Sequence, residues 1–284
     1  MTADRELAPG LYLVGTPIGN LEDMTLRAIR VLKQADVIAC EDTRQTQKLL
    51  HHFGIETRAV SYHDHNEASR AAELVEKLAQ GGRVAVVSDA GMPGISDPGF
   101  RLVALAIERG IAVLPVPGPA AFLAALVASG LPTDAFSFRG FLPAKSGARR
   151  RELEKIANSS STEIFYEAPH RIKETLTDVV EVLGPERSVV VARELTKIHE
   201  EFLRGTAGEV AQALNARGEI KGEITLLIGK ASEGTSAPRG VSVRERVEEI
   251  MRDEQVDEKA ALKKVAKERG ISKSEAYREL QQRK

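Results

Sequence analysis

The chain has 284 residues, 42% of them hydrophobic, which is enough to bury sizeable cores in two or three domains. Its 40 basic and 41 acidic residues leave a formal net charge of −1, which excludes a chain-wide attraction to nucleic acid. A single cysteine, Cys40, excludes internal disulfides and thiolate metal clusters. With no apolar run of about 20 residues and no basic-then-apolar leader, we expect a cytoplasmic protein without a membrane segment.

Charge is unevenly distributed along the chain. Residues 239–284 carry 13 basic and 10 acidic side chains, a net of +3, so the remaining 27 basic and 31 acidic residues leave −4 on residues 1–238. The basic excess therefore lies in the C-terminal tail. The absence of Trp and the 4% share of aromatic residues disfavour extensive base stacking as a mode of RNA recognition.

The first half alternates short apolar strands with helices. A strand at 11–14 precedes a helix with Leu26, Ile29 and Leu32 at helical spacing, for which Asp23 or Thr25 is the N-cap. Further strands are predicted at 37–40, 57–61, 84–87 and 111–114, with helices ending at 79 and spanning 100–109. This alternation predicts an α/β domain with a parallel sheet.

A Pro- and Gly-rich stretch at 115–122 marks the boundary between two α/β domains, residues 1–117 and 118–230. Pro119 suits the first position of a helix that ends at Gly130. The second half predicts strands at 136–139, 163–166, 188–192 and 224–228, and helices at 148–157, 171–183 and 208–215, the last with a Thr206–Glu209 capping box.

The tail is predicted to form a separate helical domain. Residues 231–240 resemble a linker, and residues 241–284 form three short helices of helix-turn-helix character, at 242–253, 257–269 and 273–282. Asp257 and Ser272 are the expected N-caps, and Gly270 ends the middle helix. Such capped helices after a linker suit nucleic-acid docking, although Lys263 and Lys264 are also consistent with a solvated helix face.

The loop at 88–99 is the strongest ligand-binding candidate. It follows a buried strand and is rich in Gly and Pro, so its backbone can approach a ligand closely. The turn at 15–20 has Gly-x-x-x-Gly with a Pro inside, which fits neither the dinucleotide fingerprint nor a phosphate loop.

Together with residues 117–121, these two loops resemble the tetrapyrrole methylase (class III) family of S-adenosylmethionine-dependent methyltransferases. Four further blocks, at 14–23, 41–44, 165–171 and 192–200, are similar to the ribosomal RNA branch of that family. Ala90, where the corrinoid branch has Pro, also favours the ribosomal branch. The resemblance covers essentially the whole chain.

The resemblance implies two α/β domains with the methyl donor in the cleft between them, and a small helical domain at the C-terminus. It implies transfer from S-adenosylmethionine to the 2′-oxygen of a cytidine ribose in 16S rRNA of the 30S ribosomal subunit, by a homodimer. No metal is implied. The donor-binding residues that it implies are Pro17, Ile18, Asp89, Ala90, Gly91, Met92, Gly94, Ala120, Ala121, Tyr166 and Ile224.

A ribose hydroxyl is a poor nucleophile near neutral pH, so a side chain that takes its proton would help the reaction. Glu167 and Glu194 are the favoured candidates, as base or as the group orienting the hydroxyl, and His170 is a reserve base. The cations expected to hold phosphates are Arg44, Arg171, Arg193 and Lys197, with Lys263 and Lys264 in the tail.

Structural roles compete with these assignments. In the structural alternative, Arg193 and Glu194 form only an ion pair with each other, Asp42 only caps a helix, and Cys40 takes a core position. A solvated polar loop explains His63 and His65 better than a metal site does.

Two other functions remain open at this stage. One is a corrinoid C-methyltransferase on the same scaffold, which would have no need of the basic tail. The other is a ligand-sensing regulator with the tail as DNA reader, which would have no need of the Arg, Glu and His clusters at strand ends.

Overall fold

The computed structural model describes residues 6–63, 66–96, 99–231, 247–248, 250–252, 256–268, 276–278 and 280. The chain divides into two compact units, Met1–Lys230 and Ala231–Lys284. Within the first unit, one sheet ends at Val116 and the other begins at Phe136. The domain boundary after residue 117 stays a prediction.

The first sheet is entirely parallel, as the alternating pattern predicts. Its strand order is β3-β2-β4-β1-β5. The strands are β1 (Gly10–Val14), β2 (Val37–Cys40), β3 (Ala59–Ser61), β4 (Arg83–Val86) and β5 (Val113–Val116). The carboxyl ends of all five strands therefore meet at one edge, where ligands bind in open α/β sheets.

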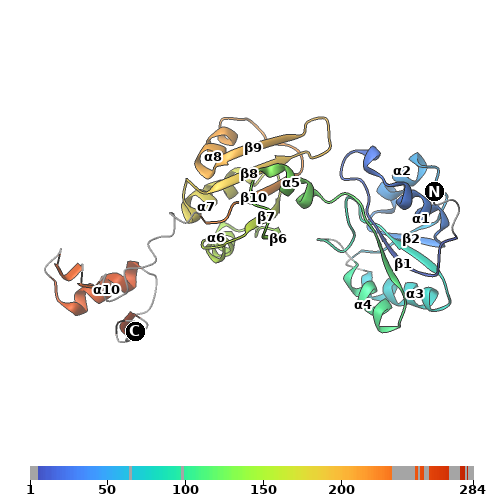
Figure 1. Ribbon diagram of the computed structural model, residues 1–284, viewed down its shortest axis with the longest axis horizontal. Coiled ribbons are helices and arrows are strands. Elements are labelled where there is room, and N and C mark those ends of the chain that lie inside the picture. The colour runs from blue at the N-terminus through green and yellow to red at the C-terminus, as the bar shows by residue number, and fades with distance from the viewer. Residues whose placement is uncertain are drawn as a thin grey trace. The chain divides into compact units, whose positions relative to one another are not determined.

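Helices cover both faces of this sheet (Figure 1). Because successive strand residues point to opposite faces, Val14, Ile38 and Ala85 pack on one side, and Leu11 and Val84 pack on the other. The first face is covered by α1 (Leu26–Gln34) and α2 (Thr43–His52), and the second by α3 (Glu67–Ala79) and α4 (Phe100–Glu108).

The helix caps resolve two alternatives. Thr25 is the N-cap of α1, and its hydroxyl accepts a hydrogen bond from the amide of Ala28 at 3.0 Å. Asp23 instead belongs to a short 3₁₀ helix, η1 (Leu21–Asp23). Asp42 caps α2, as expected, and Cys40 is a buried core residue.

The second sheet is mixed. Its order is β6-β7-β10-β8-β9, with β6 parallel to β7 and every other pair antiparallel. The strands are β6 (Phe136–Phe141), β7 (Thr162–Glu167), β8 (Ser188–Arg193), β9 (Glu201–Thr206) and β10 (Ile224–Ile228). Strand β9 is not among the strands predicted from the sequence, because a strand at the edge of a sheet tolerates the charged residues and the glycine that weaken its apolar pattern.

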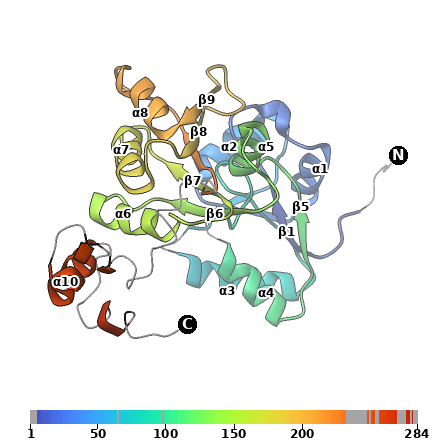
Figure 2. The same cartoon turned by 60° about the vertical axis from the view of Figure 1, so that its left-hand side comes forward.

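The helices of this half lie on opposite faces of the second sheet (Figure 2). One face packs against α6 (Ser146–Lys155), α7 (Ile172–Leu183) and α8 (Ala207–Asn215), and the other packs against α5 (Ala121–Ser129). Ile18, from the loop after β1, belongs to the same buried cluster as α5. This contact joins the first loop to the second sheet.

Two helix termini in this half lie where the sequence predicts them, and one does not. Gly130 ends α5 in a left-handed conformation at φ 80°, and Thr206 with Glu209 forms the capping box of α8. Pro119 is not the first residue of α5. The helix begins at Ala121, because the preceding Ala120 is extended at φ −143°.

The C-terminal unit has a small apolar core of its own, formed by residues that include Val247, Ala261, Val265 and Ala276. Its helix α10 (Glu258–Glu268) starts after Asp257, whose carboxylate accepts a hydrogen bond from the amide of Ala260 at 2.7 Å. The linker at 232–240, Gly270 and the Ser272 cap lie outside the described residues. Within the described ranges, no helix is long and apolar enough to cross a membrane.

Candidate active site

The loop that follows β4 is tied to the loop that follows β1. The amide of Thr16 donates to the carbonyl of Gly91 at 3.0 Å, and the amide of Gly91 donates back at 3.1 Å. The buried Thr16 hydroxyl donates to the carbonyl of Ser88 at 3.1 Å. Gly91 takes φ +88°, a conformation open to glycine. These bonds hold the 88–96 segment beside the end of the neighbouring strand.

A cavity of about 420 Å³ opens beside this loop, and that volume lies in the range of small-molecule sites. Its walls come from the loops after β1 and β4, the start of α5, and the ends of β7 and β10. We call it the donor pocket. Nine residues assigned to the donor from sequence line it: Ile18, Asp89, Ala90, Gly91, Met92, Ala120, Ala121, Tyr166 and Ile224.

The other two assigned residues are placed differently. Pro17 lines a neighbouring cavity, whereas Gly94 lines neither of the two. Several further wall residues, among them Phe141 and Glu223, were not predicted from the sequence. Phe141 lies beyond a register shift in β6 that no local pattern reveals, and its ring meets that of Tyr166 edge-on at 5.6 Å. Glu223 could have been found from the sequence, because it directly precedes Ile224, which was assigned to the donor site.

Glu167 lines the pocket, but its carboxylate is held by protein groups. It accepts hydrogen bonds from Arg171 Nη2 at 2.6 Å, the Thr175 hydroxyl at 2.6 Å and the amide of Ala168 at 2.8 Å. Its side chain is 0% exposed. This arrangement suits a group that holds the pocket wall in place.

Glu194 is held in a three-residue ion cluster. Lys197 Nζ lies 2.8 Å from Glu194 Oε1 and 2.9 Å from Glu223 Oε2. The hydrogen bond from Lys197 lowers the pKa of Glu194, against the effect of burial. Burial lowers the pKa of Lys197, but hydrogen bonds from Nζ to the two carboxylates outweigh it, so the net shift is upward. A carboxylate with a lowered pKa is a weaker proton acceptor.

The ion cluster lies on a strained loop. Glu194 and Thr196 take φ 54° and 65°, values that are uncommon for residues other than glycine and rare for a β-branched one. Two glycines make space for the side chains of this loop. A Cβ atom at Gly19 would lie 2.5 Å from Lys197 Cγ, and one at Gly222 would lie 2.4 Å from Glu194 Cδ. Strain of this kind clusters at functional sites.

Glu194 and the remaining candidates do not line the donor pocket. His170 is exposed on the turn before α7. Arg193 forms an ion pair with Glu201 at 3.2 Å and not with Glu194. The predicted Arg193–Glu194 ion pair was therefore wrong, although Arg193 does pair with a carboxylate. Arg44 is 87% exposed, and its side chain lowers the pKa of Asp42 to about 2 through a hydrogen bond.

Two further observations concern metals and the tail. Among the described residues, no three His, Cys, Asp or Glu side chains are grouped to hold a metal ion. Of the His63–His65 loop, residues 64 and 65 lie outside the described ranges.

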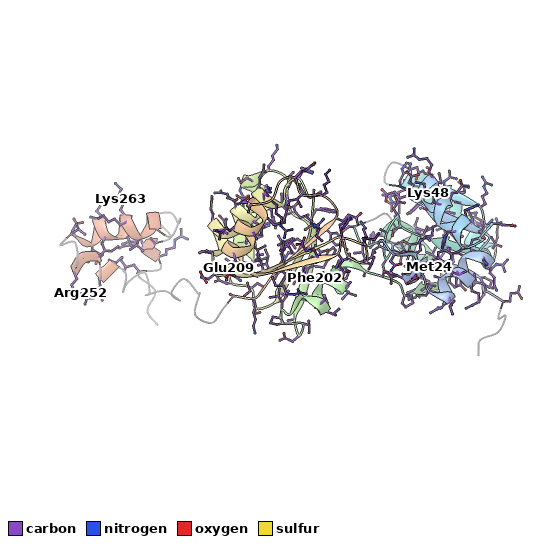
Figure 3. The ribbon with its side chains drawn as sticks, turned by 90° about the horizontal axis from the view of Figure 1, so that it is seen from above. Met24, Lys48, Phe202, Glu209, Arg252 and Lys263 are labelled. Carbon is purple, nitrogen blue, oxygen red and sulfur yellow. The ribbon has the colours of Figure 1, made fainter. Side chains whose placement is uncertain are left out.

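The two lysines predicted to contact RNA in the tail, Lys263 and Lys264, are exposed on α10, and Figure 3 labels Lys263 there.

The family model described as Tetrapyrrole (Corrin/Porphyrin) Methylases matches residues 10–211. The chain belongs to this family. Its relatives in the tetrapyrrole methylase family include proteins named Ribosomal RNA small subunit methyltransferase I. The one from Halalkalibacterium halodurans is 50% identical over 94% of this chain and 93% of its own length. The one from Mesorhizobium japonicum is 47% identical over 97% and 92%.

Solved structures of tetrapyrrole methylases share the fold at low identity. A cobalt precorrin-4 methyltransferase superposes with a TM-score of 0.56 at 19% identity, covering 77% of this chain and 94% of its own. The uroporphyrin-III C-methyl transferase of Thermus thermophilus, complexed with S-adenyl homocysteine, has a TM-score of 0.52 at 23% identity and covers 78% and 97%. These matches confirm the two-sheet α/β architecture predicted from the sequence.

Proposed function

We propose that this protein transfers a methyl group from S-adenosylmethionine to the 2′-oxygen of a cytidine ribose in 16S rRNA of the small ribosomal subunit. The observation that carries the proposal is the donor pocket, because nine of the residues assigned to the donor from sequence line one cavity of about 420 Å³. The acceptor is supported by relatives about 50% identical over nearly their whole length, which are named for small-subunit ribosomal RNA.

The pocket residues fit the donor chemically. Gly91, Ala90, Ala120 and Ala121 have small side chains or none, so backbone groups can approach adenosine and methionine. Tyr166 and Phe141 supply flat apolar walls, and Asp89 and Glu223 supply carboxylates that suit hydroxyl and ammonium groups.

When bound, S-adenosylmethionine would supply a methyl carbon that is already activated by its sulfonium. Transfer would exchange the carbon–sulfur bond for a carbon–oxygen bond to the ribose, leave the bonding electrons on sulfur and pass the hydroxyl proton to a side-chain base or to water. The protein therefore needs to align the hydroxyl, exclude water and accept a proton. Glu167 holds the wall through Arg171 and Thr175, while Glu194 holds Lys197 against Glu223.

In this proposal the RNA is held by the basic residues named from sequence. The side chains of Arg171 and Arg193 are only 17% and 22% exposed, whereas Arg44, Lys263 and Lys264 are exposed, so these three are the more accessible cations. The C-terminal unit would add phosphate contacts to a catalytic unit whose own charge is acidic.

We further propose that the protein acts as a cytoplasmic homodimer. Support comes from large apolar side chains exposed on the first unit, Met1–Lys230, notably Phe100 and Ile107 on α4 and Val127 on α5. Light scattering of the purified protein tests the dimer directly, and a mass of about one chain would contradict it.

The central test is incubation with methyl-labelled donor and three acceptors: small ribosomal subunits, protein-free ribosomal RNA and a uroporphyrinogen-type tetrapyrrole. We expect label in RNA, recovered after nuclease digestion as 2′-O-methylcytidine. Label in the tetrapyrrole would favour the corrinoid alternative. Donor binding without transfer to any acceptor would favour the sensor alternative.

A further inference from the structure

A second cavity, of about 630 Å³, adjoins the donor pocket. It is bounded by the loop after β1, by α2 and by Lys197. Both cavities are lined by Ile18, Asp89, Ala90 and Glu223. These four residues therefore form the border between the two cavities. We call it the α2 pocket.

Thr46 gives the α2 pocket a weakly bonded hydroxyl. The residue is 4% exposed, lines the pocket, and its hydroxyl has no nitrogen or oxygen partner among the residues that the structure describes. It contacts the thiol of Cys40, and this hydrogen bond lowers the pKa of the thiol against the larger, opposite effect of burial. Sulfur is a weak acceptor, so a ligand oxygen or nitrogen in the cavity would give the hydroxyl a stronger partner.

The charged groups of the α2 pocket differ in their availability. Lys197 is neutralised by Glu194 and Glu223. Lys48, an exposed side chain labelled in Figure 3, is held by the side-chain oxygen of Gln45 at 3.0 Å and forms no ion pair with a described carboxylate. Lys48 is therefore the cation on this wall that can meet a phosphate.

Two of the four sequence blocks that resemble the ribosomal RNA branch contribute residues to this cavity. Block 14–23 contributes Thr16, Pro17 and Gly19, and block 192–200 contributes Lys197. Helix α2, which begins within block 41–44, contributes Gln45, Thr46 and Lys48. Block 165–171 lines the donor pocket instead.

We propose that the α2 pocket binds the acceptor nucleotide of the RNA. The Thr46 hydroxyl bonds to its base or sugar, Lys48 contacts its phosphate, and the reacting hydroxyl reaches the donor pocket at the border formed by Ile18, Asp89 and Glu223. This inference rests on the proposed function and adds the place of the substrate to it.

The experiment fills the cavity from an exposed helix position. Gln45→Trp puts a large side chain on the pocket wall, and Gln47→Trp is the matched control, since Gln47 is also exposed on α2 but does not line the cavity. We expect Gln45→Trp to lower kcat/KM for small ribosomal subunits at least tenfold, while affinity for S-adenosylhomocysteine, measured by calorimetry, changes less than twofold. Gln47→Trp should match the wild type in both.

A second pair of variants tests the hydroxyl. Thr46→Val removes it with little change of shape and should raise KM for the subunits severalfold, whereas Thr46→Ser should restore most of the affinity. Wild-type kinetics in both Gln45→Trp and Thr46→Val would overturn the inference, as would an equal loss of donor affinity in Gln45→Trp. If the wild-type protein methylates no ribosomal RNA, the proposed function fails and this inference fails with it.

Discussion

Gly15 and Gly118 pack backbone against backbone at the ends of two neighbouring strands. A Cβ atom at Gly15 would lie 2.7 Å from Gly118 Cα, and one at Gly118 would lie 2.8 Å from Gly15 Cα. Val14, directly before Gly15, and Val116, two residues before Gly118, are register partners of β1 and β5. The chain therefore passes from this contact directly to Ile18 on one side and to Ala120 on the other, both on the wall of the donor pocket.

Substituting either glycine should damage both the fold and donor binding. The neighbour of the added methyl is backbone, which cannot rotate away, so we expect Gly15→Ala or Gly118→Ala to cost about 1–3 kcal/mol of unfolding free energy. Donor affinity should fall at least tenfold. Urea unfolding and calorimetry measure the two effects, and Gly147→Ala, where nothing lies within 4 Å, is the control. Unchanged donor affinity in both variants would contradict the prediction.

Glu167→Gln should act on stability before it acts on chemistry. The substitution leaves the charge of Arg171 without its carboxylate in a largely buried position, and breaking such a pair costs about 3–5 kcal/mol. We expect a lower midpoint of urea unfolding and less methyl transfer, with the shape of the pH–rate profile unchanged. Glu186→Gln, at an exposed position, is the control. Loss of the acidic limb of the profile at unchanged stability would instead identify Glu167 as the base.

The Glu194–Lys197 pair should make stability depend on pH in a defined window. The pKa of Glu194 is lowered from 4.5, so its contribution is present above that pH and is lost as pH falls through the folded-state value. The pKa of Lys197 is raised from 10.5, so its contribution is present below that pH and is lost as pH rises through the folded-state value.

The variant Lys197→Met tests this window. It should cost on the order of 1 kcal/mol at pH 7, because two neighbouring carboxylates lose their shared cation, and the cost should shrink toward pH 3 as they become protonated. Urea unfolding at both pH values measures it. Lys155→Met, which breaks only a surface pair with Glu152, should show almost no cost at either pH. A pH-independent cost for Lys197→Met would rule out the electrostatic origin.

The exposed lysines of α10 should affect RNA and not the donor. Replacing Lys263 and Lys264 by Ala should weaken binding to small subunits at low salt and reduce the salt dependence of log K by about 1 per lysine. Affinity for S-adenosylhomocysteine should stay the same. Lys33→Ala, an exposed lysine on α1, is the control. An unchanged salt slope would mean that this helix face is only solvated.

The amino-acid sequence determined the features that depend on residues close together in the chain. Short apolar runs alternating with helical patterns predicted the five parallel strands of the first sheet, Thr25 and Asp42 were each one of two alternatives considered at their positions, and the Gly- and Pro-rich loop at 88–99 was predicted to approach a ligand. These features follow from backbone sterics and local hydrogen bonds, which act over a few residues.

Only the tertiary structure decided which distant groups meet. The last strand, β10, enters between β7 and β8, and this brings Glu223 to Lys197 and Glu194 across a gap of about 30 residues. Arg193 pairs with Glu201 rather than with its neighbour because the two are register partners of β8 and β9, and Thr46 faces a cavity shared with Asp89. Partner choice for a charge or a buried hydroxyl depends on which strand ends the topology places at one edge, and no local pattern carries that information.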